Sequence, residues 1–287
     1  LEFRTLIDRV LKKDISGNGI TSATGNKVAT GKSAPSPLPL FPEEEGGMQG
    51  DLFANFTPDE PGEAKKSNLE TLESLTYNYQ LIDTEEKRRR IIQKLLTSKI
   101  LSLDTETTGT EPMDAELVGM SFSIAENEAF YVPVPSDQDE ALKIVNEFRP
   151  VFENENSLKV GQNIKYDMIV LQNYGAVVKG PLSDTMIAHY VLQPELRHGM
   201  DHLAEIYLHY QTIHIDELIG PKGKNQKNMR DLDPKDVYLY ACEDADITLK
   251  LKNVLEKELK ENDAERLFYD IEMPLVPVLV NIERNGV

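Results

Sequence analysis

Hydrophobic and polar positions follow regular periods over a long stretch of the chain from about residue 77 to about residue 262. Alternating or continuous apolar runs predict short strands, of which the second and third form a hairpin. The strands expected are 100–105, 117–124, 129–134 and 158–161. Apolar residues at helical spacing predict helices over 83–98, 164–174, 184–192, 200–209 and 236–260. Hairpin strands come first and strands alternating with helices follow, which predicts an α/β fold with a mixed sheet flanked by helices.

The segments on either side of this region have a different composition. Residues 1–13 predict a short amphipathic helix. Residues 14–75 are rich in Gly, Ser, Pro and acidic residues, and such a stretch buries too little apolar surface to offset its ordering entropy. We therefore expect a linker there. Residues 265–287 predict another amphipathic helix, whose apolar face has no obvious partner, and we interpret it as the opening of a following domain.

The charge of the chain is strongly negative, with 31 basic against 49 acidic residues and a net charge of −18. Broad binding to a phosphate backbone needs clustered Lys and Arg, so this balance argues against it. Two considerations weaken that argument. Acidic residues in a cleft can hold divalent cations, which then meet the phosphate. A basic partner domain could also belong to a longer protein of which this chain is a segment.

Cysteine content and hydropathy exclude two further classes of protein. The single cysteine, Cys242, excludes an internal disulfide framework and fits a reducing compartment. We expect it to be a small helix-packing residue. No apolar run approaches the roughly 18 residues that span a bilayer.

Two carboxylates follow a short apolar run. Because side chains alternate along a strand, Asp104 and Glu106 share one face, while Leu101 and Leu103 share the other. The strand ends before Gly109, so both acids lie near its carboxyl end, where α/β sheets hold their ligands. The pair alone leaves two interpretations open, a metal site and a solvated strand end.

Two further clusters carry acids on predicted helices. Asn163 and Asp167 share a helical face, and Gly161 before them permits a sharp entry from the strand. The alternative is a capped helix start with an exposed Asp167. Tyr240 and Asp244 share a face of a later helix in the same way, and the alternative there is a solvated acidic face.

Together, the acids and the tyrosine stand in the order and local setting of the DEDD exonuclease superfamily, tyrosine subclass. The residues concerned are Asp104, Glu106, Asp167, Tyr240 and Asp244. Further segments resemble the 3′-5′ exonuclease (proofreading) domain of the bacterial DNA polymerase I family, family A. These segments are VGQNIKYD, SDTMIAHYVL, RHGMDHLAE, GPKGKNQ and YACEDADITL, and the resemblance covers about residues 77–287.

The resemblance implies a ribonuclease H-like fold and a division of the chain. LEFRTLIDRV resembles the tail of a 5′-nuclease domain, and ERNGV resembles the start of a polymerase domain. The division expected is 1–13 for that tail, 14–75 for a flexible linker, 76–264 for the exonuclease domain and 265–287 for the truncated start of the polymerase domain.

The resemblance also implies chemistry with two metal ions. Two divalent cations roughly 4 Å apart can activate a water and stabilise the leaving oxygen of a phosphodiester. Carboxylates suit Mg²⁺ or Mn²⁺, with Zn²⁺ as an alternative at one site. By resemblance, Asp104 bridges the ions, Glu106 and Asp244 complete the first site, and Asp167 supports the second. Tyr240, with a free pKa of about 10, is expected to orient the attacking water with help from Glu106.

Residues for the substrate are carried over in the same way. The resemblance places Gln162, Asn163 and Tyr166 at the terminal nucleotides and Arg197 near the scissile phosphate. A basic cluster near the site either meets the incoming strand or is an ordinary surface loop. Its residues are Lys222, Lys224, Lys227 and Arg230.

The sequence departs from the family at two positions of this site. Thr110 and Ile215 stand where the family often uses a leucine and an aromatic residue. This departure affects how tightly the single-stranded DNA end is expected to be held, since base stacking is worth about 1–3 kcal/mol per base.

The leading hypothesis is a 3′-5′ exonuclease that acts on single-stranded DNA ends and removes misincorporated nucleotides in replication and repair. Its expected partners are the DNA 3′ end and the polymerase and 5′-nuclease domains of a longer chain. We expect a monomer without membrane association in the bacterial cytoplasm, at the nucleoid. One alternative is a catalytically silent scaffold, against which the presence of all four acids argues. The other is an RNase D-like exoribonuclease, against which the polymerase-like flanks argue.

Overall fold

A computed structural model describes residues 69–286 except 222 and 224. The chain divides into two units, Leu1–Glu63 and Ala64–Val287, and the first lies outside the described residues. The helix expected over 1–13 and most of the expected linker therefore fall outside them as well. The described end of that linker includes Leu72, which is buried. The assignment of the segments to named domains stays a prediction.

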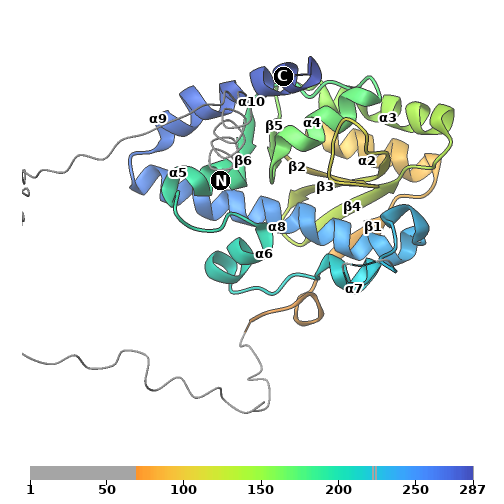
Figure 1. Cartoon of the computed structure of the whole chain (residues 1–287), viewed down its shortest axis with the longest axis horizontal. Coiled ribbons are helices and arrows are strands. Elements are labelled where there is room, and N and C mark those ends of the chain that lie inside the picture. Colours follow the sequence, from red (N-terminus) through yellow and green to blue (C-terminus); the bar gives the residue numbers. More distant parts are fainter. Residues whose placement is uncertain (1–68, 222, 224, 287) are drawn as a thin grey trace, which may run out of the picture. The chain divides into compact units, whose positions relative to one another are not determined.

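A mixed six-stranded sheet forms the centre of the described unit, with the strand order β1-β4-β3-β2-β5-β6 (Figure 1). β3 is antiparallel to β2 and β4, whereas the remaining neighbours are parallel. The predicted α/β class and the hairpin are confirmed. The strands are β1 Asn78–Leu81, β2 Ile100–Thr107, β3 Leu117–Ala125, β4 Glu128–Pro133, β5 Leu158–Gly161 and β6 Leu182–Asp184.

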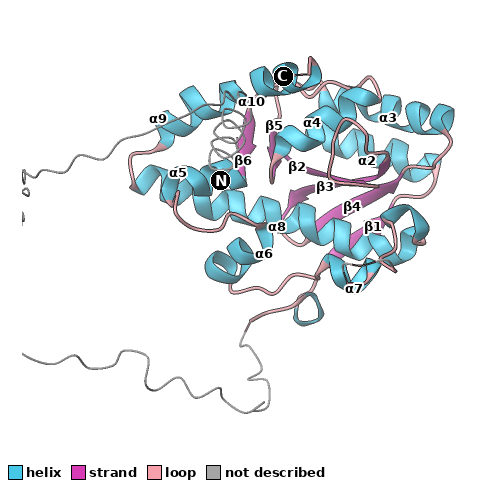
Figure 2. Ribbon diagram, in the orientation of Figure 1, coloured by secondary structure: helices cyan, strands magenta, loops and turns pink. Residues whose placement is uncertain are grey.

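Helices lie on both sides of the sheet and at its ends (Figure 2). The α-helices are α2 Glu85–Thr97, α3 Gln138–Phe152, α4 Ile164–Asn173, α5 Thr185–Leu192, α6 Met200–Leu203, α7 Ile215–Ile219, α8 Pro234–Glu261, α9 Glu265–Leu267 and α10 Met273–Arg284. Shorter 3₁₀ or π segments are Leu72–Ser74, Ala204–Leu208, Met229–Asp231 and Phe268–Glu272. None of the helices within the described residues is long and apolar enough to cross a membrane.

β2 lies in the middle of the sheet, and its two faces have different neighbours. Leu101 and Leu103 belong to the core formed with α2 and α3, where Phe148 is also buried. The other face of the sheet is covered by α8, which starts at Asp233 as its N-cap and has Pro234 in its first turn (Figure 1). This arrangement brings the acids of β2 and the acids of α8 together.

Several elements differ from the sequence-based expectation. β1, β6, α3 and α7 were not expected, and the helix expected over 200–209 divides into α6 and a π segment. The expectation that the C-terminal helix has no partner in this chain is wrong. Val276 and Val280 of α10 are buried in the same core as α4. An exposed apolar stripe that includes Ile271 remains on the outer side. Cys242 is fully buried on α8, as expected.

Candidate active site

Strand β2 places two acids on the face that α8 covers. Asp104 pairs with Ser121 of β3, and Glu106 pairs with Gly119. A Cβ atom at Gly119 would lie 2.3 Å from ring atoms of Tyr131, so only glycine leaves room for this ring beside the acids. The side chain of Glu106 is buried, whereas that of Asp104 is half-buried. The predicted alternation along this strand is confirmed.

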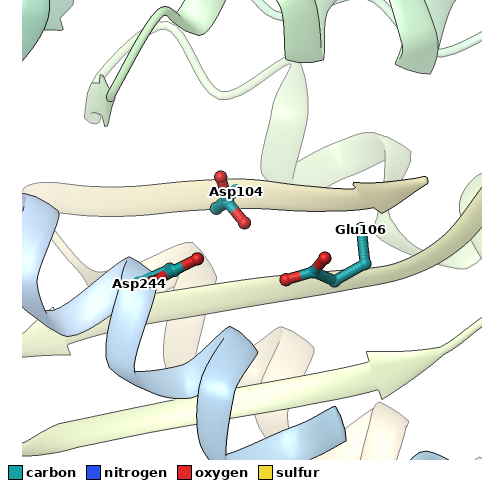
Figure 3. A group of neighbouring side chains, drawn as sticks. All are labelled: Asp104, Glu106 and Asp244. Atoms are coloured by element: carbon teal, nitrogen blue, oxygen red, sulfur yellow. The ribbon is translucent and has the colours of Figure 1, made fainter. Parts of the chain in front are cut away.

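Helix α8 supplies the third acid of the cluster. Oxygen atoms of Asp104, Glu106 and Asp244 lie within 4.8 Å of one another, and Figure 3 shows the three carboxylates converging between β2 and α8. Tyr240 lies one turn earlier on the same helix, where its hydroxyl interacts electrostatically with the Asp244 carboxylate. Burial raises the pKa of Tyr240 far above its ordinary value, so the phenol remains a neutral donor.

The fourth acid approaches from another helix. Asp167 lies in the first turn of α4 and is buried. Its Oδ1 atom accepts a hydrogen bond of 2.6 Å from the Thr105 hydroxyl. Burial and then the charge of Asp104 raise its pKa well above the usual range, so the two carboxylates interact electrostatically. Asp167 therefore flanks the cluster of three without being one of its members.

The electrostatics of the cluster favour a bound cation. Burial raises the pKa of Asp104 to about 6. Burial, and then repulsion from Asp104, raises the pKa values of Glu106 and Asp244 well above their usual ranges. Moreover, the Oε1 atom of Glu106 is buried without a hydrogen-bond partner. Such an oxygen is costly to leave unpaired, and a hard cation is a suitable partner for it. The residues present therefore fit a divalent metal ion.

The entry to α4 depends on one acid that sequence reasoning passed over. Asn163 has a left-handed backbone with φ of 63°, and its neighbour Ile164 donates its N–H to Asp184 at 2.7 Å. The same carboxylate caps α5 through the N–H of Ile187 at 3.0 Å. Asp184 is fully buried. The run SDT at 183–185 indicated this capping role, because an acid that precedes a predicted helix is a common N-cap.

The residues expected to meet the substrate occupy different settings. A cleft of about 690 Å³ beside Glu106 is lined by Asn163, Tyr166, Thr110 and Ile215, among others. The Tyr166 hydroxyl lies 2.5 Å from the hydroxyl of Thr107 and 2.5 Å from the carbonyl oxygen of Gly109. These contacts hold the Tyr166 side chain in the lining of the cleft.

Gln162 and Arg197 lie outside the lining of this cleft. The Gln162 amide donates to the carbonyl oxygen of His198 at 2.7 Å and accepts from the Thr185 hydroxyl, so its polar atoms are used within the protein. Arg197 is exposed in the loop that precedes α6. Its neighbour His198 places its ring 2.7 Å, between Nδ1 atoms, from that of the buried His189.

The expected basic cluster is only partly available to a strand. Lys222 and Lys224 lie outside the described residues. Lys227 lines the cleft. The Arg230 guanidinium instead donates to the carbonyl oxygens of Val134 and Leu117, at 2.5 and 2.6 Å. Arg230 therefore joins the start of β3 and the end of β4 to the segment before α8, and of the two alternatives for this residue a role toward an incoming strand is not supported.

Without bound cation, the stability of the protein is expected to fall as the pH rises from 5 to 8. Because the folded-state pKa of Asp104 is raised to about 6, the folded protein binds protons more tightly than the unfolded chain. That contribution is complete below the unfolded pKa and is lost as the pH rises through the folded one, by about 3 kcal/mol for the whole shift, of which about half lies between pH 5 and pH 8. Added Mg²⁺ should offset the loss, because it binds the ionised carboxylates.

Thermal unfolding in EDTA and in Mg²⁺ across this pH range checks the expectation. The difference between wild type and Asp104→Asn isolates the contribution of this carboxyl group. A melting temperature in EDTA that depends on pH equally in both proteins would contradict it.

Comparison with known proteins agrees with this geometry. Residues 79–260, more than half of the chain, match a family described as 3′-5′ exonuclease. The chain belongs to this 3′-5′ exonuclease family. It is 37% identical over 251 residues to the DNA polymerase I of Pseudomonas aeruginosa, covering 82% of this chain and 27% of that protein. It is 32% identical over 251 residues to the DNA polymerase I of Borreliella burgdorferi, covering 86% of this chain and 27% of that protein. The chain thus spans 27% of the length of these relatives.

Solved structures share the fold. The superposition on NrnC from Brucella melitensis has a TM-score of 0.58 with 18% identity, covering 74% of this chain and 94% of that chain. The superposition on the POL domain of Pol1 from M. smegmatis, in complex with DNA primer-template and dNTP, has a TM-score of 0.55 with 19% identity, covering 71% of this chain and 32% of that chain. The fold is therefore the ribonuclease H-like α/β fold that the sequence predicted.

Proposed function

We propose that this exonuclease domain hydrolyses the terminal phosphodiester at the 3′ end of single-stranded DNA with the help of two divalent cations. One observation carries the proposal: oxygens of Asp104, Glu106 and Asp244 converge within 4.8 Å. The unpartnered Oε1 atom of Glu106 adds to it. Family membership supports the reaction class, and the carboxylates support the use of metal.

The carboxylates would hold Mg²⁺ or Mn²⁺, with Zn²⁺ as an alternative at one site. Bound there, the cations supply an activated water and charge stabilisation for the leaving oxygen. Asp104 is half-buried in this cluster, and the family resemblance makes it the ligand that both ions would share. Asp167, flanking the cluster, would support the second ion.

Tyr240 would position the attacking water rather than deprotonate it. Burial, and then the charges of Asp244, Glu106 and Asp104, raise the pKa of Tyr240 and keep the phenol protonated. A protonated phenol cannot act as a base, but it can donate or accept a hydrogen bond. Glu106 has an oxygen without a protein partner and would assist in orienting the same water.

The cleft beside Glu106 would receive the terminal nucleotides. Asn163 and Tyr166 line it and offer polar groups, and Ile215, which is 41% exposed, offers an apolar wall. Aliphatic Ile215 stacks on a base less well than an aromatic ring does. Arg197 would approach the scissile phosphate from its exposed loop. Gln162 would act indirectly, because it donates a hydrogen bond to His198 in the loop that carries Arg197.

In its biological setting, the domain would remove misincorporated nucleotides for a DNA polymerase I in replication and repair. The similarity to bacterial DNA polymerases I supports this setting. Its partners would be the DNA 3′ end and the polymerase and 5′-nuclease domains of a longer chain. A monomeric state, a cytoplasmic location and association with the nucleoid stay predictions.

The test compares DNA and RNA strands of one sequence, each single-stranded and in a blunt duplex, with Mg²⁺ or Mn²⁺. We expect single-stranded DNA to be shortened fastest. Faster shortening of RNA would replace the proposal with an exoribonuclease of the RNase D type. A folded, cation-binding protein that shortens none of the strands would indicate a silent scaffold. Asp139→Asn, an exposed acid on α3, serves as the matched control and should behave as wild type.

A further inference from the structure

Thr105 occupies the position between the two acids of β2, but its side chain faces the other side of the sheet. Asp104 and Glu106 face α8, and alternation along the strand turns the side chain of Thr105 toward α4. Only 9% of Thr105 is exposed. Its pairing partner on β3 is Met120, which is buried in the hydrophobic core that includes residues of α2 and α3. A hydroxyl in this apolar setting needs a specific partner.

That partner is the fourth acid of the site. The Thr105 hydroxyl lies 2.6 Å from Oδ1 of Asp167, and both side chains are buried. A carboxylate accepts but does not donate, so the hydroxyl is the donor when Asp167 is ionised. The bond occupies Oδ1 and restricts the rotation of the carboxylate.

Asp167 needs such a partner more than the other acids do. Asp104 and Glu106 belong to a strand held by the sheet ladder, and Asp244 belongs to the middle of the long helix α8. Asp167 belongs to the first turn of α4, which enters through a left-handed residue. The bond from Thr105 ties this turn directly to the strand that carries the cluster.

We infer that Thr105 is a positioning residue for Asp167. The orientation that it gives to this carboxylate sets how tightly the second divalent cation is held. The inference rests on the proposed two-cation function. Groups that orient a metal ligand typically change metal affinity or activity by 10- to 100-fold when they are removed. Loss of the Thr105 hydroxyl should therefore raise the cation concentration needed for half-maximal cleavage by about 10-fold or more.

Three variants separate this role from a general effect of packing. Thr105→Val keeps the shape but removes the hydroxyl, and Thr105→Ser keeps the hydroxyl but removes the methyl group. Ser102→Ala removes another buried hydroxyl of β2, whose oxygen has no hydrogen-bond partner. We expect Thr105→Val to shift the Mg²⁺ dependence, Thr105→Ser to restore it to within about threefold, and Ser102→Ala to leave it unchanged.

A double variant tests whether the effect passes through Asp167. If Thr105 acts only by orienting that carboxylate, adding Thr105→Val to Asp167→Asn should change the Mg²⁺ dependence no further. Thermal unfolding verifies that each variant folds. If Thr105→Val does not fold, Thr105→Ala takes its place. A folded variant without the hydroxyl that keeps the wild-type Mg²⁺ dependence overturns the inference.

Direct Mn²⁺ binding distinguishes this failure from failure of the proposed function. Electron paramagnetic resonance of free Mn²⁺ gives the number of bound ions and their affinities without any substrate. We expect two ions in wild type, and one of them weakened in Thr105→Val. Equal binding in both proteins overturns the role of Thr105 even if cleavage is not observed. A wild-type protein that binds no Mn²⁺ overturns both the proposed function and this inference.

Discussion

Replacement of Asp104 by asparagine is expected to reduce exonuclease activity by at least about 10³-fold, or roughly 4 kcal/mol in the barrier. Oxygens of Asp104, Glu106 and Asp244 lie within 4.8 Å of one another, and Asp104 is the member that we propose both cations share. An amide has the shape of the carboxylate but no charge with which to hold a cation. Initial rates on a labelled single strand, with Mg²⁺ in excess, provide the measurement.

The same substitution should stabilise the protein in EDTA. Burial raises the pKa of Asp104 to about 6, so its ionised form is unfavourable at pH 8 when no cation is bound. A variant that loses activity and also unfolds at lower temperature would indicate a damaged fold instead. Asp139→Asn, an exposed acid in the first turn of α3, should change neither quantity by a comparable amount.

Replacement of Asp184 by alanine is expected to lower the free energy of unfolding by about 3–4 kcal/mol, the sum of a lost helix cap and buried N–H groups without partners. The carboxylate accepts from Ile164 at the start of α4 and from Ile187 at the start of α5. For a domain of this size, the melting temperature should fall by roughly 10 °C. Thermal unfolding provides the measurement.

A matched control shows whether the position or the residue type matters. Asp137 caps α3 through the N–H of Glu140 at 2.9 Å, but it is exposed to solvent. Asp137→Ala should therefore lower the free energy of unfolding by only about 1 kcal/mol. Activity should fall in Asp184→Ala and not in Asp137→Ala, because α4 carries Asp167. Equal destabilisation of the two variants would contradict the bridging role of Asp184.

The parts of the fold with strong local patterns were predictable from the sequence. β2, the β3–β4 hairpin and α8 have apolar periods that continue for several residues, and their expected bounds differ from the observed ones by a few positions. The acids were found because carboxylates that follow a strand or share a helical face leave a pattern in the sequence. Their convergence depends on the packing of α8 across β2, which the resemblance implied and no local pattern contains.

The remaining features depend on tertiary contacts. β1 and β6 are only a few residues long, and each pairs at an edge of the sheet with a strand distant in sequence. Thr105 has a role only because α4 packs against β2, and Gly119 only because Tyr131 crosses it. For Arg230, contact with substrate and an ordinary surface position were both left open because its charge fits either, but it binds the carbonyl oxygens of Leu117 and Val134.

The most direct test of the central claim follows a 5′-labelled single-stranded DNA with wild type and Asp104→Asn, in Mg²⁺ and in EDTA. The structure predicts a ladder of products that shorten stepwise from the 3′ end with wild type in Mg²⁺. It also predicts that the ladder disappears in EDTA and in the variant. Release of the labelled 5′ nucleotide as the first product, or an undiminished ladder with Asp104→Asn, would contradict the assignment of this carboxylate cluster as the centre of a 3′-5′ exonuclease.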